Sequence, residues 1–310
     1  MNSAPFSILL AGPTAAGKSA IALELAKRVD GEIVSVDSMQ VYRGLDLGTA
    51  KPSAADLARV PHHLINVVDL SESFDAAWFV RGAEAAVKQI QSRGRVPIFC
   101  GGTGLYFKVW LNGLGQAPAG DPKLRAELEA TPLDQLLVEL EKADPVTFGQ
   151  IDRKNPRRVI RALEVIRLTG QPFSAQRAAW PDQSSKQSST LAFGFARAAG
   201  DLHERIQHRV DEMFRNGLVA ETERLMACGL AENRTAMQAL GYRQVAEHLR
   251  GERSLPETIE LVKIRTRQFA KRQLTWFRRQ LRLEWITLDP AAAPAAIAAD
   301  LARRWEQGKR

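Results

Sequence analysis

The 310-residue sequence predicts a mostly parallel α/β sheet with a helical insertion. Short apolar runs alternate with helical patterns in the first part of the chain, which is typical of a parallel sheet covered by helices. After Gly113 the patterns become helical, and no strand signal returns until Leu191. We therefore predict an α/β core made of residues 1–113 and 191–310, with a helical insertion at residues 114–190.

Five strands are predicted, each a short apolar run bounded by turn or polar residues, as expected of buried parallel strands. They are Ser7–Ala11, Glu32–Val36, Leu64–Val68, Val96–Cys100 and, after the insertion, Leu191–Phe195.

Helical spacing of apolar residues predicts the remaining elements. The predicted helical stretches are Ser19–Val29, Phe74–Ser92, Pro122 to about Trp180, and Asp201 to about Arg282. Gly113–Pro122 holds three Gly and two Pro and reads as a boundary. Pro181–Thr190 is rich in Ser, Gln and Asp, which is typical of a mobile loop. The last helix follows the Ala/Pro-rich stretch Pro290–Ala299 and is expected at the periphery.

Composition excludes several classes of protein. Hydrophobic residues make up 45% and charged residues 25%, so the chain can bury a core. No apolar run approaches the ~20 residues of a membrane span, and the N-terminus lacks a basic region before its apolar stretch. Two cysteines, Cys100 and Cys228, are too few for a disulfide framework. We expect a cytoplasmic protein, and a monomer.

One phosphate-binding motif is complete. It consists of Gly12, Pro13, Thr14, Ala15, Ala16, Gly17, Lys18 and Ser19, between a predicted strand and a predicted helix. Backbone N–H groups of such a loop bind phosphate oxygens, Lys18 adds charge, and the Ser19 hydroxyl can hold Mg²⁺. The motif predicts a P-loop NTPase-like core. It leaves open whether the ligand is a nucleotide such as ATP or a diphosphate that acts as a leaving group.

Two polar segments follow predicted strands and should therefore lie near the P-loop, because strand carboxyl ends face the ligand crevice. Asp37 follows the second strand and could bind Mg²⁺ through water, act as a general base, or cap the next turn. Gly101–Tyr106 follows the fourth strand. There Thr103 could donate to a phosphate, a base or a ribose, or the segment could be only a flexible turn.

Basic residues are concentrated in two places. The net charge is +8, and Lys263–Leu283 alone holds eight basic residues and no acid. At about 100° per residue, seven of the eight lie opposite an apolar seam, and only Lys263 lies within it. The seam comprises Val262, Phe269, Ala270, Leu274, Trp276, Phe277 and Leu281, and the basic face comprises Arg265, Arg267, Lys271, Arg272, Arg278, Arg279 and Arg282. The second cluster spans Arg153–Arg167. The basic helix could also be an ordinary solvated face or a membrane-surface helix, but two cationic elements beside a P-loop favour a nucleic-acid partner.

Together these segments resemble a known family. GPTAAGKS, DSMQVYRGLDLGTAKP, PHHLI, GGTGLY, NPRRVIRALEV, ALGYRQ and TRQFAKRQLTWFR occur in the order found in the tRNA dimethylallyltransferases, also called tRNA isopentenyltransferases. The chain is similar to the bacterial form, without the zinc-finger extension of eukaryotic members. The resemblance implies transfer of a dimethylallyl group from dimethylallyl diphosphate to N6 of adenine 37, 3′ of the tRNA anticodon, with release of diphosphate.

The resemblance also implies roles for particular residues. Asp37 would remove the N6 proton, Lys18 and Thr14 would act at the diphosphate together with the rest of Gly12–Ser19, and Ser19 would hold Mg²⁺. The segments implied to contact tRNA are Asp37, Ser38, Met39, Gln40, Thr103, Arg125, Arg157, Arg158, Val159, Ile160, Arg161, Ala239, Leu240, Gly241, Tyr242, Arg243 and Gln244. Where many relatives carry an arginine this chain has Gly200, so that role would pass to Arg205 or Arg209.

Two other functions use the same residues. A P-loop kinase of a nucleoside or small metabolite would use Asp37 as the base for a hydroxyl, and would need no basic helix. A nucleotide-switched RNA-binding protein would need segments that sense a γ-phosphate, and no second acidic Mg²⁺ site is evident. His62 and His63 are expected to pack and hydrogen-bond, not to bind a metal.

Overall fold

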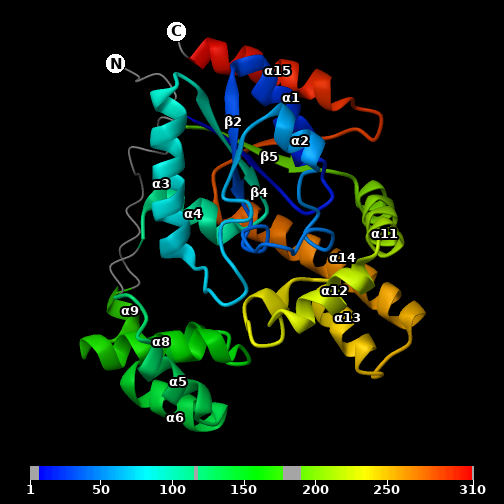
Figure 1. Ribbon diagram of the computed structural model, residues 1–310. Helices are drawn as coiled ribbons and strands as arrows, with labels where there is room; N and C mark the ends of the chain where they lie inside the picture. The colour runs from blue at the N-terminus through cyan, green and yellow to red at the C-terminus, as the bar shows by residue number, and fades with distance from the viewer. Residues whose placement is uncertain (1–6, 115–117, 177–189, 309–310) are drawn as a thin grey trace. The chain divides into compact units, whose positions relative to one another are not determined.

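The computed structural model describes residues 7–114, 118–176 and 190–308. The chain forms two compact units, one of residues 1–111 and 185–310 and the other of residues 112–184 (Figure 1). The sequence predicts the boundaries between the core and the insertion after residues 113 and 190. The segment predicted as a mobile loop, Pro181–Thr190, lies outside the described residues except for Thr190.

The first unit is built on one six-stranded sheet in which every pair of neighbouring strands is parallel. Its strands are β1 (Ser7–Ala11), β2 (Gly31–Val36), β3 (His62–His63), β4 (Val96–Gly101), β5 (Thr190–Ala196) and β6 (Glu284–Thr287), in the order β3-β2-β4-β1-β5-β6. Every residue of β1 and β2 is buried, as expected of inner parallel strands. The predicted α/β class is confirmed.

The third strand was predicted in the wrong place. His62 and His63 pair with β2, whereas the predicted strand Leu64–Val68 forms only an isolated bridge between Val68 and Tyr42. Leu64 and Asn66 have φ angles of 62° and 55°, which an extended strand cannot accommodate. The two histidines hydrogen-bond as expected: a ring nitrogen of His63 lies 2.7 Å from the Glu32 carboxylate.

The first unit also holds ten helices in the described residues. They are α1 (Lys18–Val29), α2 (Ala54–Arg59), α3 (Ala76–Ser92), α4 (Gly104–Asn112), α11 (Ala199–Arg215), α12 (Leu218–Ala227), the 3₁₀ helix η1 (Ala236–Gln238), α13 (Tyr242–Leu249), α14 (Leu255–Gln280) and α15 (Pro294–Gly308). None of them is long and apolar enough to cross a membrane.

The C-terminal part of the chain differs from the prediction. β6 was missed, because four residues at a sheet edge carry little periodic signal. The last helix was expected at the periphery, yet α15 packs against α1 (Figure 1). Ala298, Leu301 and Trp305 of α15 belong to the main apolar core, together with Ile8 of β1. Alanine-rich helices can approach a neighbouring helix closely, so composition misled the prediction here.

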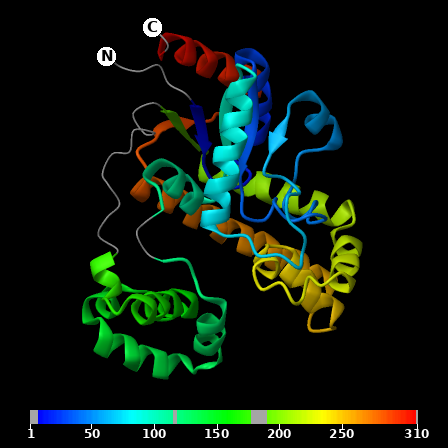
Figure 2. The ribbon, with the colours of Figure 1, turned by 60° about the vertical axis from the view of Figure 1, so that its left-hand side comes forward.

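In its described residues, the second unit consists of helices, which Figure 2 shows in a turned view. They are α5 (Pro122–Ala130), α6 (Leu133–Ala143), α7 (Pro145–Gln150), α8 (Pro156–Thr169) and α9 (Phe173–Gln176). The helices α5, α7 and α8 share a start signal, with Pro in the first turn and an Asp or Asn side chain capping the helix. Leu128, Leu140 and Leu163 lie in the core of this unit.

Candidate active site

The P-loop connects β1 to α1 and has the curled backbone that its sequence predicts. Gly12 has a φ of 153°, and a Cβ there would lie 2.7 Å from the Phe195 carbonyl oxygen, so a larger residue would collide with β5. Gly17, with a φ of 95°, precedes the first turn of α1. Lys18 begins that helix and is buried. Its Nζ donates to the Pro13 carbonyl oxygen at 2.7 Å, so the lysine closes over its own loop.

Two arginines hold the outer side of the loop. Arg197 Nε donates to the Ala16 carbonyl oxygen at 2.9 Å, and Arg205 Nε donates to the Ala15 carbonyl oxygen at 3.0 Å. Ala15 has a φ of 62°, a conformation that costs free energy for a residue with a Cβ. The arginines therefore help to hold the loop in a strained shape, with its carbonyl oxygens occupied by cations.

Asp37 follows β2 directly and both caps a turn and lines a cavity. Its Oδ1 accepts hydrogen bonds from the backbone N–H groups of Met39 at 2.8 Å and Gln40 at 3.2 Å. In the described part of the chain its Oδ2 accepts none. The next residue, Ser38, donates its N–H to Thr103 Oγ1 at 3.1 Å, which joins this turn to the loop after β4.

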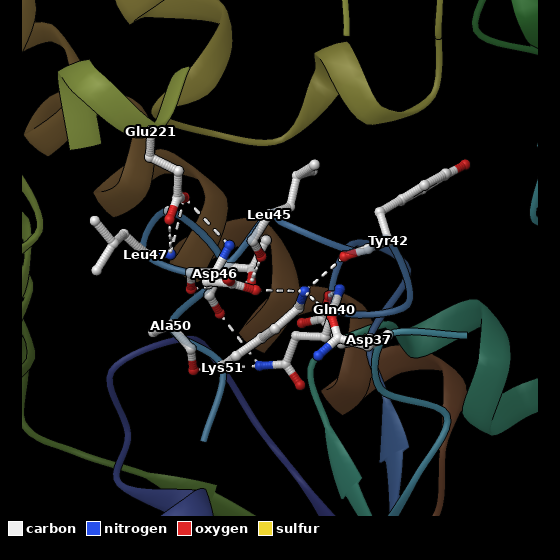
Figure 3. Close-up of polar contacts among 12 residues, drawn as sticks. Asp37, Gln40, Tyr42, Leu45, Asp46, Leu47, Ala50, Lys51 and Glu221 are labelled. Atoms are coloured by element: carbon white, nitrogen blue, oxygen red, sulfur yellow. Dashed lines mark hydrogen bonds and ion pairs between the residues drawn. The ribbon is translucent and has the colours of Figure 1, made fainter. Parts of the chain in front are cut away.

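The segment from Asp37 to Lys51 is held by a network of polar groups (Figure 3). Gln40 Nε2 donates to the carbonyl oxygens of Thr49 and Ala50 at 3.2 and 3.3 Å. The Lys51 ammonium donates to Asp46 Oδ1 at 2.8 Å and also to the Tyr42 carbonyl oxygen. Burial lowers the pKa of Lys51, and the hydrogen bond to Asp46 opposes that shift.

A helix from the C-terminal half closes this network. Glu221 of α12 accepts from the Leu47 N–H at 3.0 Å and from the Tyr242 hydroxyl at 2.6 Å (Figure 3 shows the Glu221 carboxylate directed at Leu47). Tyr242 also accepts from the Gly48 N–H at 3.0 Å. The segment after Asp37 is therefore fixed from two sides, which orients the Asp37 carboxylate.

A cavity of about 430 Å³ brings these groups together. Of the residues implied by the family resemblance, its lining includes Thr14, Lys18, Ser19, Asp37, Ser38, Met39, Gln40, Thr103, Ala239 and Leu240. Burial lowers the pKa of Lys18 to about 8, and the charges of Arg209 and Asp37 act on it as well. Lys18, Arg209 and Asp37 all line this cavity.

Other implied residues do not reach the cavity. Tyr242 is fully buried and bonded to Glu221, and Gln244 is buried with Oε1 accepting from the Gly241 N–H at 3.0 Å. Arg243 is exposed and donates to Glu247 at 3.2 Å. In this stretch, Arg243 has the side chain that is exposed for the implied contact with RNA. Tyr242 and Gln244 are buried instead and hold the backbone beside Ala239 and Leu240.

Several cavity residues were not anticipated from local sequence. Arg209 of α11 is half-buried and lines the cavity. It has no ion-pair partner among the described residues. Gln273, Thr266, Arg272 and Phe269 line it from α14. The remaining apolar lining includes Val210, Met213 and Val262. The family resemblance had named Arg209, with Arg205, as a candidate for the role of the arginine missing at Gly200, and of these two Arg209 lines the cavity.

The basic helix is largely as predicted, with four exceptions. The first is that α14 ends at Gln280, so Arg282 lies beyond it. Arg267 is half-buried and bonded to His203 at 2.9 Å, so it is not on the open face. Phe269 was assigned to the apolar seam but is 37% exposed and lines the cavity. Lys263 forms ion pairs with Asp211 and Glu260 at 2.9 and 2.8 Å, which neutralise it within the seam. The exposed cations are Arg265, Lys271, Arg272, Arg278, Arg279 and Arg282.

The implied residues of the second unit fall into two groups. Glu164 is fully buried, and its Oε2 accepts from Arg125 and Arg161, each at 2.6 Å. Those two arginines therefore stabilise the unit, and the side chains of both remain partly exposed. Arg157 and Arg158 are exposed at the start of α8, whereas the adjoining Val159 and Ile160 are buried in its core.

The fold and the cavity define a class: a P-loop α/β protein in which a phosphate-binding loop and an aspartate open on one cavity beside a basic helix. Comparison with known proteins is more specific. The model of the IPP transferase family matches residues 40–280, and the chain belongs to that family.

Its relatives carry consistent names. The chain is 45% identical over 279 residues to tRNA dimethylallyltransferase 1 of Citrifermentans bemidjiense, covering 90% of this chain and 91% of that one. It is 44% identical over 299 residues to tRNA dimethylallyltransferase 1 of Trichlorobacter lovleyi, covering 95% of this chain and 98% of that one.

Solved structures agree with these relatives. The tRNA isopentenylpyrophosphate transferase of Bacillus halodurans is 37% identical, with a TM-score of 0.70 over 99% of this chain and 98% of that one. A eukaryotic dimethylallyltransferase acting on tRNA is 27% identical, with a TM-score of 0.81 over 98% of this chain and 80% of that one.

Proposed function

We propose that this chain is a tRNA dimethylallyltransferase. It would transfer a dimethylallyl group from dimethylallyl diphosphate to N6 of adenine 37 in tRNA and release diphosphate. The observation that carries the proposal is one cavity of about 430 Å³ lined by a P-loop, a carboxylate and an apolar set of side chains. A prenyl diphosphate and an adenine together need those three surfaces.

The diphosphate would bind at the P-loop. Backbone N–H groups at the start of α1 and the Lys18 ammonium face phosphate oxygens in such loops. Arg209 lines the same cavity without an ion-pair partner among the described residues, so its charge is available to an anion. As the allylic C–O bond breaks, negative charge grows on the leaving diphosphate, and fixed cations in a partly buried site stabilise that change.

The site also suits Mg²⁺. The Ser19 hydroxyl is exposed and lines the same cavity as the Asp37 carboxylate, and oxygen ligands are those that Mg²⁺ prefers. Mg²⁺ keeps several waters and binds partly through substrate phosphates, so a site with few protein ligands is expected. When bound through Ser19 it would neutralise charge on the diphosphate.

Asp37 would be the general base. The new bond joins adenine N6 to the allylic carbon, the C–O bond to diphosphate breaks, and the N6 proton passes to Asp37. Two N–H groups hold Oδ1, which leaves Oδ2 for the proton. Adenine N6 is a weak nucleophile, so orientation of the two substrates would supply much of the rate. The base must leave the stack of the anticodon loop to reach this cavity.

Apolar side chains account for the prenyl group. Val210, Met213, Val262 and Phe269 line the cavity, and burial of a five-carbon group against them is favourable by about 0.8 kcal/mol per CH₂-sized unit. These surfaces would also exclude water from an allylic carbon that gathers positive charge.

The RNA would be held by basic surfaces of each unit. On the first unit the exposed cations of α14, from Arg265 to Arg279, lie on the helix that lines the cavity through Arg272, and exposed Arg282 follows its end. On the second unit Arg157 and Arg158 are exposed. Contacts of this kind bind phosphates irrespective of base sequence. The proposal includes a monomer that acts in the cytoplasm.

Label transfer tests the proposal. Purified protein is incubated with Mg²⁺, radiolabelled dimethylallyl diphosphate and an anticodon stem-loop with adenine at position 37. The expected result is label in the RNA, and none when adenine 37 is replaced by guanine. Label retained after that replacement would contradict the proposed target. Absence of transfer, together with ATP-dependent phosphorylation of a small acceptor, would instead identify a P-loop kinase.

A further inference from the structure

Gln273 joins two substrate-binding loops through a single side chain. It lies on α14, and its Oε1 accepts from the Thr14 N–H of the P-loop at 2.8 Å. Its Nε2 donates to the Gly102 carbonyl oxygen, in the loop after β4, at 2.9 Å. Those loops follow the adjacent strands β1 and β4, and Gln273 lies 171 residues after Gly102 and 259 residues after Thr14 in the chain.

The amide has only one workable orientation. Turning it by 180° would set its NH₂ group against the Thr14 N–H and its oxygen against the Gly102 carbonyl. Gln273 is buried, so an unpaired amide group there would be costly. Space is equally restricted: a Cβ on Gly102 would lie 2.4 Å from Gln273 Nε2. Both hydrogen bonds and the glycine therefore belong to one arrangement.

The same helix carries the basic surface. Arg272, next to Gln273, is exposed and lines the cavity, and Lys271, Arg278 and Arg279 are exposed on the same helix. A rigid α-helix moves as a unit, so a force on its outer face is transmitted to the side chains on its inner face. Gln273 is the inner-face side chain that is hydrogen-bonded to the P-loop.

We propose that Gln273 is a positioning residue that sets the distance between the P-loop and the Gly101–Gly104 loop and ties both to α14. It rests on the proposed function, in which the P-loop holds the diphosphate and α14 binds RNA. Gln273 Oε1 and Nε2 are both hydrogen-bonded to these loops, so its proposed role is exerted through them and not on a reacting atom. It holds the Thr14 amide in place, so that the diphosphate and the acceptor base meet at a fixed separation.

Replacement of Gln273 by methionine, a residue of similar size, tests the positioning role. Gln273→Met keeps the length and removes both hydrogen bonds. It should lower kcat/KM for dimethylallyl diphosphate by about 10- to 100-fold, while the Kd for the RNA stem-loop changes less than about twofold. Gln268 is an exposed glutamine five residues earlier on α14. Gln268→Met is therefore the matched control and should behave as wild type. A Gln273→Met variant with wild-type kcat/KM would overturn the proposal.

Gln273→Glu adds a pH readout that a merely structural role would not produce. When protonated, its carboxyl can accept from Thr14 and donate to Gly102, but when ionised it can only accept. The activity of this variant relative to wild type should therefore rise as the pH falls from 8 to 6. A constant ratio over that range, with both proteins folded by circular dichroism, would contradict the positioning role.

Binding of inorganic pyrophosphate separates this proposal from the proposed function. By calorimetry with Mg²⁺ present, Gln273→Met should bind pyrophosphate about tenfold more weakly than wild type. If wild type transfers no prenyl group but this loss is seen, the proposed reaction is wrong and the positioning role stands. If transfer occurs and pyrophosphate affinity is unchanged in the variant, the positioning role is wrong.

Discussion

Lys18 Nζ donates a hydrogen bond to the Pro13 carbonyl oxygen at 2.7 Å, within the loop that would bind diphosphate. Burial lowers the pKa of this lysine to about 8, well below its ordinary 10.5. The ammonium is therefore charged below about pH 8 and loses its proton as the pH rises through that value. Because the proposed substrate is an anion, this titration should appear in substrate affinity.

We expect the KM for dimethylallyl diphosphate to rise between pH 8 and 9.5. Steady-state kinetics at saturating RNA measures it. Lys18→Arg stays protonated over this range, so its KM, although higher overall, should not change with pH. A flat wild-type profile would mean that the lysine keeps its proton above pH 9.5.

Replacement of the Asp37 carboxylate should abolish proton removal without disturbing the turn. Asp37→Asn can still accept from Met39 and Gln40 through its amide oxygen. We expect a fall in kcat of about 10²- to 10⁴-fold, as for loss of a general base, with RNA and pyrophosphate affinity retained. Single-turnover transfer measures the step. Asp37→Ala should lose transfer as well, and near-normal turnover in either variant would exclude the general-base role.

Neutralising the basic face of α14 should weaken RNA binding in a salt-dependent way. Arg272→Gln with Arg279→Gln removes two exposed cations. The slope of log Kd against log salt should fall by about 1.4, at roughly 0.7 per phosphate contact. Arg28→Gln with Arg303→Gln removes two exposed cations from α1 and α15 as a control. Equal slopes for wild type and the α14 variant would place the RNA elsewhere.

Tyr242 and Arg243 should have opposite effects, although both belong to one segment implied to contact tRNA. Tyr242→Phe deprives Glu221 and the Gly48 N–H of a buried partner, so we expect about 1–3 kcal/mol of destabilisation by urea unfolding. RNA affinity should change less than about twofold. Arg243→Gln should leave stability within about 0.5 kcal/mol and weaken RNA binding. The reverse pattern would show that Tyr242 contacts RNA directly.

Most of the fold followed from patterns in consecutive residues. Four of the five predicted strands are present near their predicted positions, because buried parallel strands are continuous apolar runs. The predicted strand at Leu64–Val68 is wrong because Leu64 and Asn66 have positive φ angles, which the apolar pattern of the sequence does not reveal. Helical periodicity was sufficient for α14, yet it assigned Phe269 to the core when the side chain is partly exposed in the cavity.

The P-loop and Asp37 could be placed together from sequence for a physical reason. Parallel strands end at one edge of a sheet, so residues that directly follow β1, β2 and β4 must meet there. The same reasoning does not extend to Arg209, because its helix α11 reaches the cavity only through packing between elements distant in the chain.

The sequence by itself determined the phosphate loop, the carboxylate after β2, the parallel sheet and the basic helix, because each depends on neighbouring residues or on a rule of strand topology. Only the tertiary structure decided which polar side chains of α14 turn inward. Hydrophobic periodicity identifies both Gln273 and Arg272 as polar and does not distinguish between them. What separates them is that Thr14 and Gly102 supply Gln273 with two hydrogen-bond partners, which make its burial favourable.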